Sequence, residues 1–194
     1  VASYASDVKI VNCTFDGSAY RAIHSRGRGV HVLTSYVKGS AQGAPSSPAS
    51  FYSDGIKMVG GGVQEVRDCR IENVGGMGIL FQGEAEEFVA VGNTISGCGQ
   101  AGIAAWKTRG SGRGLIERNR VSGCNRLAGT PGAMGNAACG IHLNDGVQSG
   151  VDPARPFIPW IVRENTVWGC AAPASPTNED SGGIAVDYNA DGAV

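Results

Sequence analysis

The side chains best suited to chemistry lie far apart in this sequence. His142 is a candidate base, Asp145 and Asp187 supply carboxylates, and Lys107 supplies a cation. A base beside a cation is typical of a site for proton transfer, because the base takes the proton and the cation stabilises the negative charge left behind. Trp106 offers an aromatic face for stacking. We therefore predict a catalytic site made of the first four residues, with Trp106 binding the substrate.

Further polar side chains are expected to bind the substrate around this site. They are Asn144, Gln82, Lys57, Tyr188 and Arg109. Lys107, Arg109 and Arg113 belong to a basic, glycine-rich stretch that suits a carboxylated or sulfated ligand, although solubilising charge explains them equally well. Lys57, together with Asp54, is expected to belong to a second subsite.

Each candidate also has an ordinary structural explanation. An exposed histidine is usually solvated, and Asp145-Gly146 is a common turn pair. Asp187, Asn189 and Asp191 offer oxygen ligands for Ca²⁺, but the pattern lacks the distal Glu of an EF-hand loop and also fits a turn. We expect no required cofactor and no dedicated metal site, with Ca²⁺ as an optional cation.

A repeated pattern of short strands must bring these residues together. One position recurs two residues before an apolar residue that closes a strand, and it holds Cys13, Ser35, Cys69, Asn93, Asn119 and Asn165. The basic coil is about 22–26 residues long, which is typical of a solenoid whose coils bury their apolar sides by stacking. We expect one strand over residues 66–71, a second from residue 78 and a third near residues 88–91. Three strands per coil, with right-handed crossovers favoured, predict an all-β right-handed parallel β-helix of about six coils.

The coil count also predicts which side chains align on the outer surface of the second strand. Alternate side chains of a strand point to opposite faces, so the outward residues form two columns. The first contains His24, Lys57, Leu80, Ala104, His142 and Ala185, and the second contains Arg26, Val59, Gln82, Trp106, Asn144 and Asp187. His142 is therefore expected beside Trp106 and Asp187, whereas His24 is too far along the stack to share a proton with it.

One turn of the coil varies greatly in length. In this turn insertions are expected at residues 39–53, 125–139 and 171–182, whereas the turns at residues 75–77 and 99–101 stay short. A further insertion, residues 145–159, is expected after the second strand of the fifth coil. Long loops on a rigid scaffold are where binding and catalysis usually sit, although surface decoration is an alternative. We expect the loops to wall an open trough over the third and fourth coils. Residues 1–194 are expected to form a single β-helix domain, incomplete at both ends and thus a segment of a longer helix.

Two further columns are expected to be structural. The three asparagines of the recurring position should stack as an amide ladder that satisfies backbone groups at a turn. Cys98, Cys124 and Cys170 form another column, which predicts a stack of buried thiols, with a disulfide between adjacent coils as the alternative. Neither CxxC nor mixed Cys/His spacing occurs, so no zinc site is predicted.

Composition narrows the class of protein. Glycine makes up 31 of 194 residues, which suits a chain that bends sharply many times. The net charge of −1 does not favour nucleic acid as a partner. No apolar run approaches the ~18 residues of a membrane span. The oligomeric state is left open.

The repeats resemble those of a known superfamily. Val-Arg-Glu-Asn-Thr-Val at residues 162–167, Leu-Ile-Glu-Arg-Asn-Arg-Val at 115–121 and Gly-Ile-His-Leu at 140–143 are similar to the repeats of pectin-lyase-like right-handed β-helices. This superfamily includes polysaccharide lyases, uronan C5-epimerases, glycoside hydrolases and phage tailspike depolymerases. The resemblance implies a secreted, extracellular or cell-surface protein that binds a polysaccharide along an outer sheet. Residues 152–155 read Asp-Pro-Ala-Arg rather than the Asp-Pro-His-Asp of mannuronan epimerases, and the Asn-Thr-Asp signature of polygalacturonases is absent.

These observations favour an enzyme and leave three functions open. The first is a polysaccharide lyase or C5-epimerase on a uronic-acid-containing polymer, in which His142, Tyr188 or Lys107 removes the C5 proton. Lys107, Arg109 or bound Ca²⁺ would then neutralise the adjacent carboxylate. The second is an inverting glycoside hydrolase, with Asp145 and Asp187 as a carboxyl pair about 6.5–9.5 Å apart. The third is a non-catalytic glycan-binding or structural solenoid, such as a fibre or adhesin segment.

Overall fold

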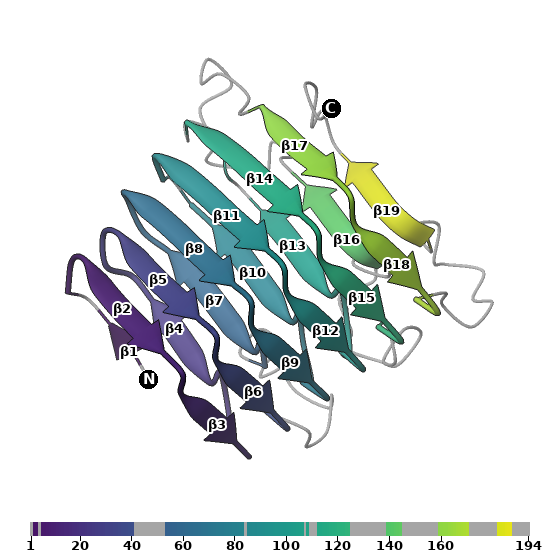
Figure 1. Ribbon diagram of the computed structural model, residues 1–194, viewed down its shortest axis with the longest axis horizontal. Helices are drawn as coiled ribbons and strands as arrows, with labels where there is room; N and C mark the ends of the chain where they lie inside the picture. Colours follow the sequence, from purple (N-terminus) through teal and green to yellow (C-terminus); the bar gives the residue numbers. More distant parts are fainter. Residues whose placement is uncertain are drawn as a thin grey trace.

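The chain winds into stacked coils whose strands form three parallel sheets around a common interior (Figure 1). The computed structural model describes residues 2–3, 5–40, 53–83, 85–106, 108, 112–124, 139–144, 159–170 and 182–187. Among these residues every strand pairs with the strand three places along the chain, so each coil adds one strand to each sheet. This arrangement confirms the predicted all-β parallel β-helix of about six coils. The same residues include no helix of a length and hydropathy suited to crossing a membrane.

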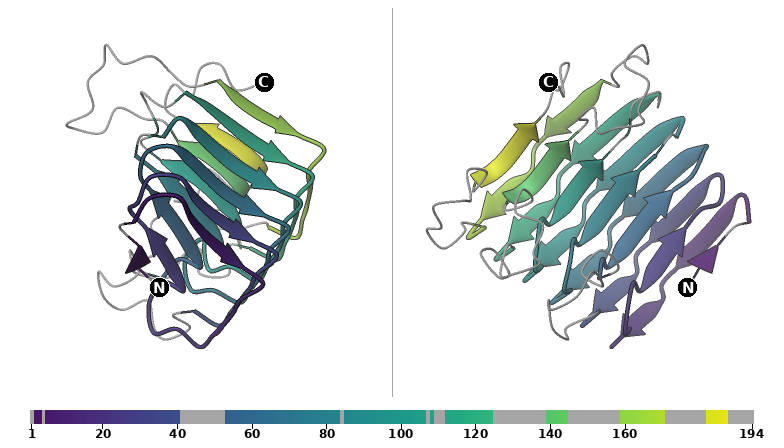
Figure 2. Two further views of the ribbon diagram at one scale, coloured as in Figure 1. Left: turned by 60° about the vertical axis from the view of Figure 1, so that its left-hand side comes forward. Right: turned by 180° about the vertical axis from the view of Figure 1, so that it is seen from behind.

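Each sheet is built from strands of two to six residues, seen from the side and from behind in Figure 2. Sheet A contains β1 (Ala2–Ser3), β4 (Ile23–Ser25), β7 (Ile56–Val59), β10 (Ile79–Gln82), β13 (Ile103–Trp106), β16 (Cys139–Asn144) and β19 (Gly182–Asp187). Sheet B contains β2 (Val8–Val11), β5 (Val30–Leu33), β8 (Val63–Arg67), β11 (Glu87–Val91), β14 (Arg113–Glu117) and β17 (Trp160–Arg163). Sheet C contains β3 (Thr14–Asp16), β6 (Tyr36–Lys38), β9 (Arg70–Glu72), β12 (Thr94–Ser96), β15 (Arg120–Ser122) and β18 (Thr166–Trp168).

The corner between sheets B and C divides what the pattern predicts as one strand. Residues 66–71 lie partly in β8 and partly in β9, and Asp68 between them has a φ of 53°. A left-handed residue turns the chain out of the extended direction. The same positive φ recurs one position before the recurring residue in every coil, at Asn12, Thr34, Asp68, Gly92, Arg118 and Glu164. Periodicity alone misses this corner because an inward apolar residue stands on each side of it.

Apolar columns fill the interior of the coils. Ile56, Ile79, Ile103 and Ile141 are paired on consecutive strands of sheet A and are fully buried. A glycine precedes each of them because other segments of the same chain approach closely at that position. A Cβ atom at Gly102 would lie 2.3 Å from Val121 Cγ1 and 3.2 Å from Cys124 Sγ, which leaves no room for a larger residue. The Gly-Ile repeat is therefore a packing requirement.

The predicted asparagine ladder is confirmed. Asn93 Nδ2 donates a hydrogen bond to Asn119 Oδ1, and Asn119 Nδ2 donates to Asn165 Oδ1, both at 2.9 Å. Each side chain also binds backbone: Asn119 Nδ2 donates to the Ala90 carbonyl, and Asn93 Oδ1 accepts from the Cys69 amide. Buried backbone groups at the B–C corner are thereby satisfied, which makes this column structural.

The cysteine column is a stack of buried thiols. Cys98, Cys124 and Cys170 are all buried, and all six cysteines of the chain are free. The Cys124 amide lies 3.4 Å from Cys170 Sγ. The thiol contact with Cys124 and the burial of the group raise the pKa of Cys170 above its ordinary value. Such thiols are poor nucleophiles, so this column packs the interior rather than reacting.

Candidate functional site

The outer surface of sheet A carries the residues predicted to act on a substrate. The register aligns the first outward column as His24, Lys57, Leu80, Ala104, His142 and Ala185. It aligns the second column as Val59, Gln82, Trp106, Asn144 and Asp187. Both alignments agree with the coil count. His142 is therefore a diagonal neighbour of Trp106, on the adjacent strand.

The exposure of this surface differs from the sequence-based expectation. Leu80, Ala104 and His142 were expected to face solvent, but their side chains are 3%, 0% and 0% exposed. Met77, Leu80, Ala101 and Ala104 pack together as an apolar cluster outside the coil interior, with the partly buried Trp106 against it. The first outward column over β10 and β13 is therefore closed to solvent, which differs from the open trough that the sequence predicts there. The loops predicted to wall that trough, residues 39–53, 125–139 and 171–182, lie largely outside the described residues.

Several predicted site residues lie outside the described part of the chain. Asp145, Lys107, Arg109 and Tyr188 belong to this group, and Asn144 and Asp187 are described by their backbone register alone. The carboxyl separation of Asp145 and Asp187 thus stays a prediction. The remaining candidates are the buried His142 and three residues with partly exposed side chains on consecutive strands, Lys57, Gln82 and Trp106.

A second group of charged residues lies at the β4–β7 end of the same surface, and sequence reasoning did not recognise it as a unit. We call Arg21, His24, Arg26, Asp54 and Lys57 the basic cluster. Arg21 Nε pairs with Asp54 Oδ2 at 3.1 Å, with side chains only 10% and 4% exposed. Arg26 Nε lies 3.4 Å from His24 Nε2. Lys57 is in register with His24. The signal available in the sequence was the spacing of His24 and Arg26, which stand two residues apart and so share one face of an extended segment.

Burial and charge determine the protonation of this cluster. Burial, followed by the positive charges of Arg21, Arg26 and Lys57, lowers the pKa of His24 from 6.5 to about 4. His24 is therefore neutral at neutral pH. Burial raises the pKa of Asp54, although Arg21, Lys57 and the hydrogen bond from the Met77 amide oppose that rise. The cluster thus combines a neutral imidazole with an excess of positive charge.

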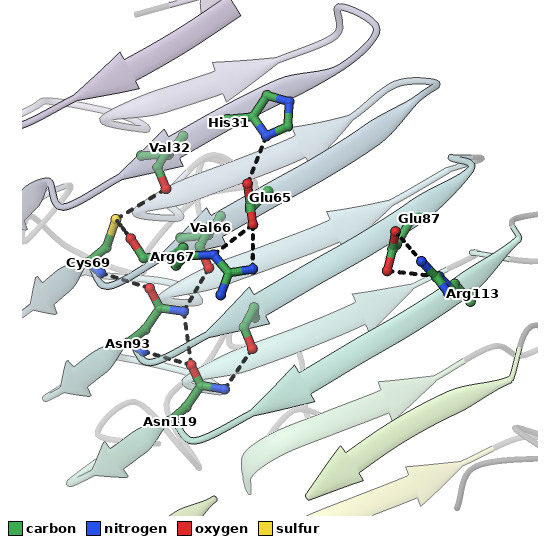
Figure 3. Close-up of polar contacts among 11 residues, drawn as sticks. His31, Val32, Glu65, Val66, Arg67, Cys69, Glu87, Asn93, Arg113 and Asn119 are labelled. Carbon is green, nitrogen blue, oxygen red and sulfur yellow. Dashed lines mark hydrogen bonds and ion pairs between the residues drawn. The ribbon is translucent and has the colours of Figure 1, made fainter.

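The outer surface of sheet B provides a contrast. His31 Nδ1 lies 2.8 Å from Glu65 Oε2, and Arg67 contacts the same carboxylate at 2.7 Å (Figure 3). Although burial favours the neutral form of Glu65, its contacts with His31 and Arg67 lower its pKa overall. Glu87 and Arg113 form another pair at 2.9 Å (Figure 3). Charges here are neutralised locally, so this surface is less suited to an anionic ligand than the basic cluster.

Metal binding is expected only from oxygen ligands near the end of the chain. Among the residues that the structure describes, no group of three or more His, Cys, Asp or Glu side chains is placed to hold a metal ion. The side chains of Asp187, Asn189 and Asp191 lie outside that part of the chain. Ca²⁺ at these residues accordingly remains a sequence-based prediction.

Comparison with known proteins identifies the architecture. A family model described as the right-handed beta helix region matches residues 1–193. This match agrees with the three-sheet stack, confirms the predicted right-handed sense and supports the pectin-lyase-like resemblance in fold. No curated protein and no solved structure matches the chain. The family match establishes the fold, and any function has to be argued from the side chains on the outer surfaces.

Proposed function

Because the chain belongs to the right-handed β-helix family, we propose that it acts on a polysaccharide along the outer surface of sheet A. The proposed substrate is a uronic-acid-containing polymer outside the cell. The proposed activity is that of a polysaccharide lyase or C5-epimerase, which begins by removing the C5 proton. This activity goes beyond the family assignment, which supports the fold alone.

One observation carries the proposal: three different binding groups lie on consecutive strands of the same outer surface. Lys57 on β7, Gln82 on β10 and Trp106 on β13 are all partly exposed on the same surface. Gln82 and Trp106 share one outward column, and Lys57 lies one strand away in the neighbouring column. Neighbouring strands lie about 4.8 Å apart, so a cation, an amide and an aromatic ring form a short staggered row. A sugar polymer offers carboxylates, hydroxyls and apolar ring faces in succession, which suits such a row.

The proposed reaction needs a base and a cation. We assign the base to His142, Tyr188 or Lys107 and the cation to Lys107 or Arg109, with Ca²⁺ able to replace the side-chain cation. The base takes the C5 proton while the cation stabilises the carboxylate beside the developing carbanion. In a lyase the electron pair then forms the C4–C5 double bond and expels the C4 oxygen, which takes a proton from water. In an epimerase a proton returns to the opposite face of C5.

A second candidate is glycan binding without a reaction. The observation that favours it is the burial of His142, whose side chain is 0% exposed. For His142 to act as the base, its ring has to become accessible when the glycan binds. Tyr188 and Lys107 would otherwise have to supply the base, or the surface would bind the polymer and leave it unchanged.

A substrate screen tests both candidates. Polygalacturonate and alginate are incubated with the protein, with His142→Gln, and with Lys9→Gln, a control on the exposed surface of β2. A lyase generates unsaturated ends that absorb in the ultraviolet, and an epimerase incorporates deuterium at C5 from heavy water. We expect His142→Gln to reduce either rate by about 100-fold and Lys9→Gln to leave it unchanged. Binding without product supports the second candidate, and new reducing ends without absorbance support a hydrolase. Absence of polysaccharide binding overturns the proposal.

A further inference from the structure

The basic cluster concentrates positive charge on a chain that is slightly acidic overall. The whole sequence has a net charge of −1. Arg21, Arg26 and Lys57 contribute three positive charges, and an ionised Asp54 contributes one negative charge, which leaves +2. Because burial raises the pKa of Asp54, any protonation of this carboxyl group increases the excess. The charges of these five side chains therefore sum to a positive value in either state of Asp54.

The positive side chains differ in how they can serve a ligand. Arg21 is held by its buried pairing with Asp54, so its charge is fixed behind the surface. Arg26 is exposed and Lys57 is partly exposed, so both reach the solvent side of sheet A. Lys57 is in register with His24, and Arg26 follows two residues after His24 on the same face. Arg26 therefore contacts the imidazole, and Lys57 lies beside it on the adjacent strand.

The contact between Arg26 and His24 indicates which ring nitrogen of His24 carries the proton. A guanidinium nitrogen can only donate, so at 3.4 Å from Arg26 Nε the His24 Nε2 atom acts as the acceptor. In a neutral ring the proton is then on Nδ1, which remains a donor. A carboxylate near this ring meets an N–H donor together with the ammonium and guanidinium groups, an arrangement of charge-assisted hydrogen bonds.

We propose that His24, Arg26 and Lys57 form a subsite for a carboxylate group of an acidic glycan, with Arg21 as a fixed supporting charge. This inference rests on the proposed function, because it names the group of the polymer that the β4–β7 end of sheet A recognises. Arg26 and Lys57 bind the carboxylate oxygens, and His24 donates through Nδ1. The subsite binds and positions the polymer, and it does not take part in the removal of the C5 proton.

Binding measurements with matched variants test this subsite. An oligogalacturonate is titrated into the wild-type protein, Arg26→Gln and Lys57→Gln, with Lys9→Gln as a charge-matched control on sheet B. We expect each cluster variant to weaken binding about tenfold and the control to bind as the wild type does. The His24 ring resonances should shift during the wild-type titration, and a neutral oligosaccharide of equal length should bind more weakly. Thermal melting confirms that each variant is folded.

The outcomes separate this inference from the proposed function. If the oligogalacturonate binds the wild type and both cluster variants equally, the subsite is wrong and Lys57 no longer supports the proposed function, which then stands only if the substrate screen yields unsaturated or epimerised product. If no acidic polysaccharide binds the wild type, both are overturned. A sulfated oligosaccharide that binds more tightly than the oligogalacturonate, with the same loss in Arg26→Gln, overturns the assignment to a carboxylate.

Discussion

Two parts of the outer surface of sheet A differ although they share one continuous register. On β4 and β7 the first outward column carries His24 and Lys57, which are both partly exposed. On β10 and β13 the same column carries Leu80 and Ala104, which are buried in the apolar cluster. The register is continuous through both parts, whereas the side chains in the column change from charged and partly exposed to apolar and buried.

This difference shows where a solenoid can vary. The inward columns are constrained by close packing, as at Gly102, whereas outward positions tolerate either Lys57 or Leu80 in adjacent strands of one column. Function has to be sought in the outward columns for that reason. The basic cluster and Trp106 on the apolar cluster together offer a charged and an apolar contact, which matches a polymer that carries both carboxylates and sugar rings.

The largest expected effect comes from removing Arg21, the buried positive charge of the basic cluster. Arg21→Met leaves the buried Asp54 carboxylate without its ion-pair partner, and we expect a loss of about 3 kcal/mol in the free energy of unfolding at neutral pH. A buried carboxyl group without this partner protonates more readily, so the loss should shrink as the solution becomes mildly acidic. Denaturant unfolding of the variant and the wild type at both pH values measures the effect.

A double variant controls for the shape of the side chains. Asp54→Asn added to Arg21→Met removes the buried charge, so it should recover part of the lost stability. If the single variant is as stable as the wild type, the pair is not buried in the way that its 3.1 Å contact and low exposure indicate.

The next prediction compares the same column in the two parts. Leu80→Ala is expected to cost about 2 kcal/mol because it removes a buried side chain from the apolar cluster. Lys57→Ala, one strand away and partly exposed, is expected to cost about 0.5 kcal/mol. Chemical denaturation of both variants provides the measurement. Equal losses would mean that the two parts of sheet A do not differ in packing.

The fold was predictable because inward packing repeats along the sequence. The recurring position, the isoleucines of sheet A and the asparagine ladder all appear as residue types at regular spacing, and the structure confirms their alignment. The corner at Asp68 was missed because the residues that take a positive φ at this corner differ in type from coil to coil. Register could therefore be predicted from the sequence, whereas the division of residues 66–71 into two strands could not.

The candidate site was less predictable because exposure depends on what packs over a surface. The coil count correctly placed His142 on the outer surface, but it could not show that this side chain is buried. His24 was compared only with the distant His142. Its actual environment depends on Arg21 and Asp54, which pair across 33 residues of sequence. Such contacts follow from three-dimensional packing, so alternation within one strand does not reveal them.

The smallest expected difference between two compared proteins concerns the protonation of the basic cluster. His24 has a pKa of about 4 in the folded protein and an ordinary value of 6.5. Between these values the unfolded chain binds the extra proton, so acidification should destabilise the folded state. His24→Gln removes this dependence. Allowing for the partial exposure of the ring, we expect the wild type to lose on the order of 1 kcal/mol more than the variant over this range. Identical pH profiles would contradict the lowered pKa.

Proton NMR titration of the His24 ring in Arg26→Gln sharpens the same prediction. Removing one of the positive charges should raise the pKa of His24 toward 6.5, but burial is the larger cause of its low value and remains in place. The pKa should therefore recover only in part. A full recovery would mean that charge rather than burial determines the protonation of His24. The β4–β7 end would then behave as an open charged surface. It would differ from the apolar cluster in its charge as well as in how tightly its side chains are packed.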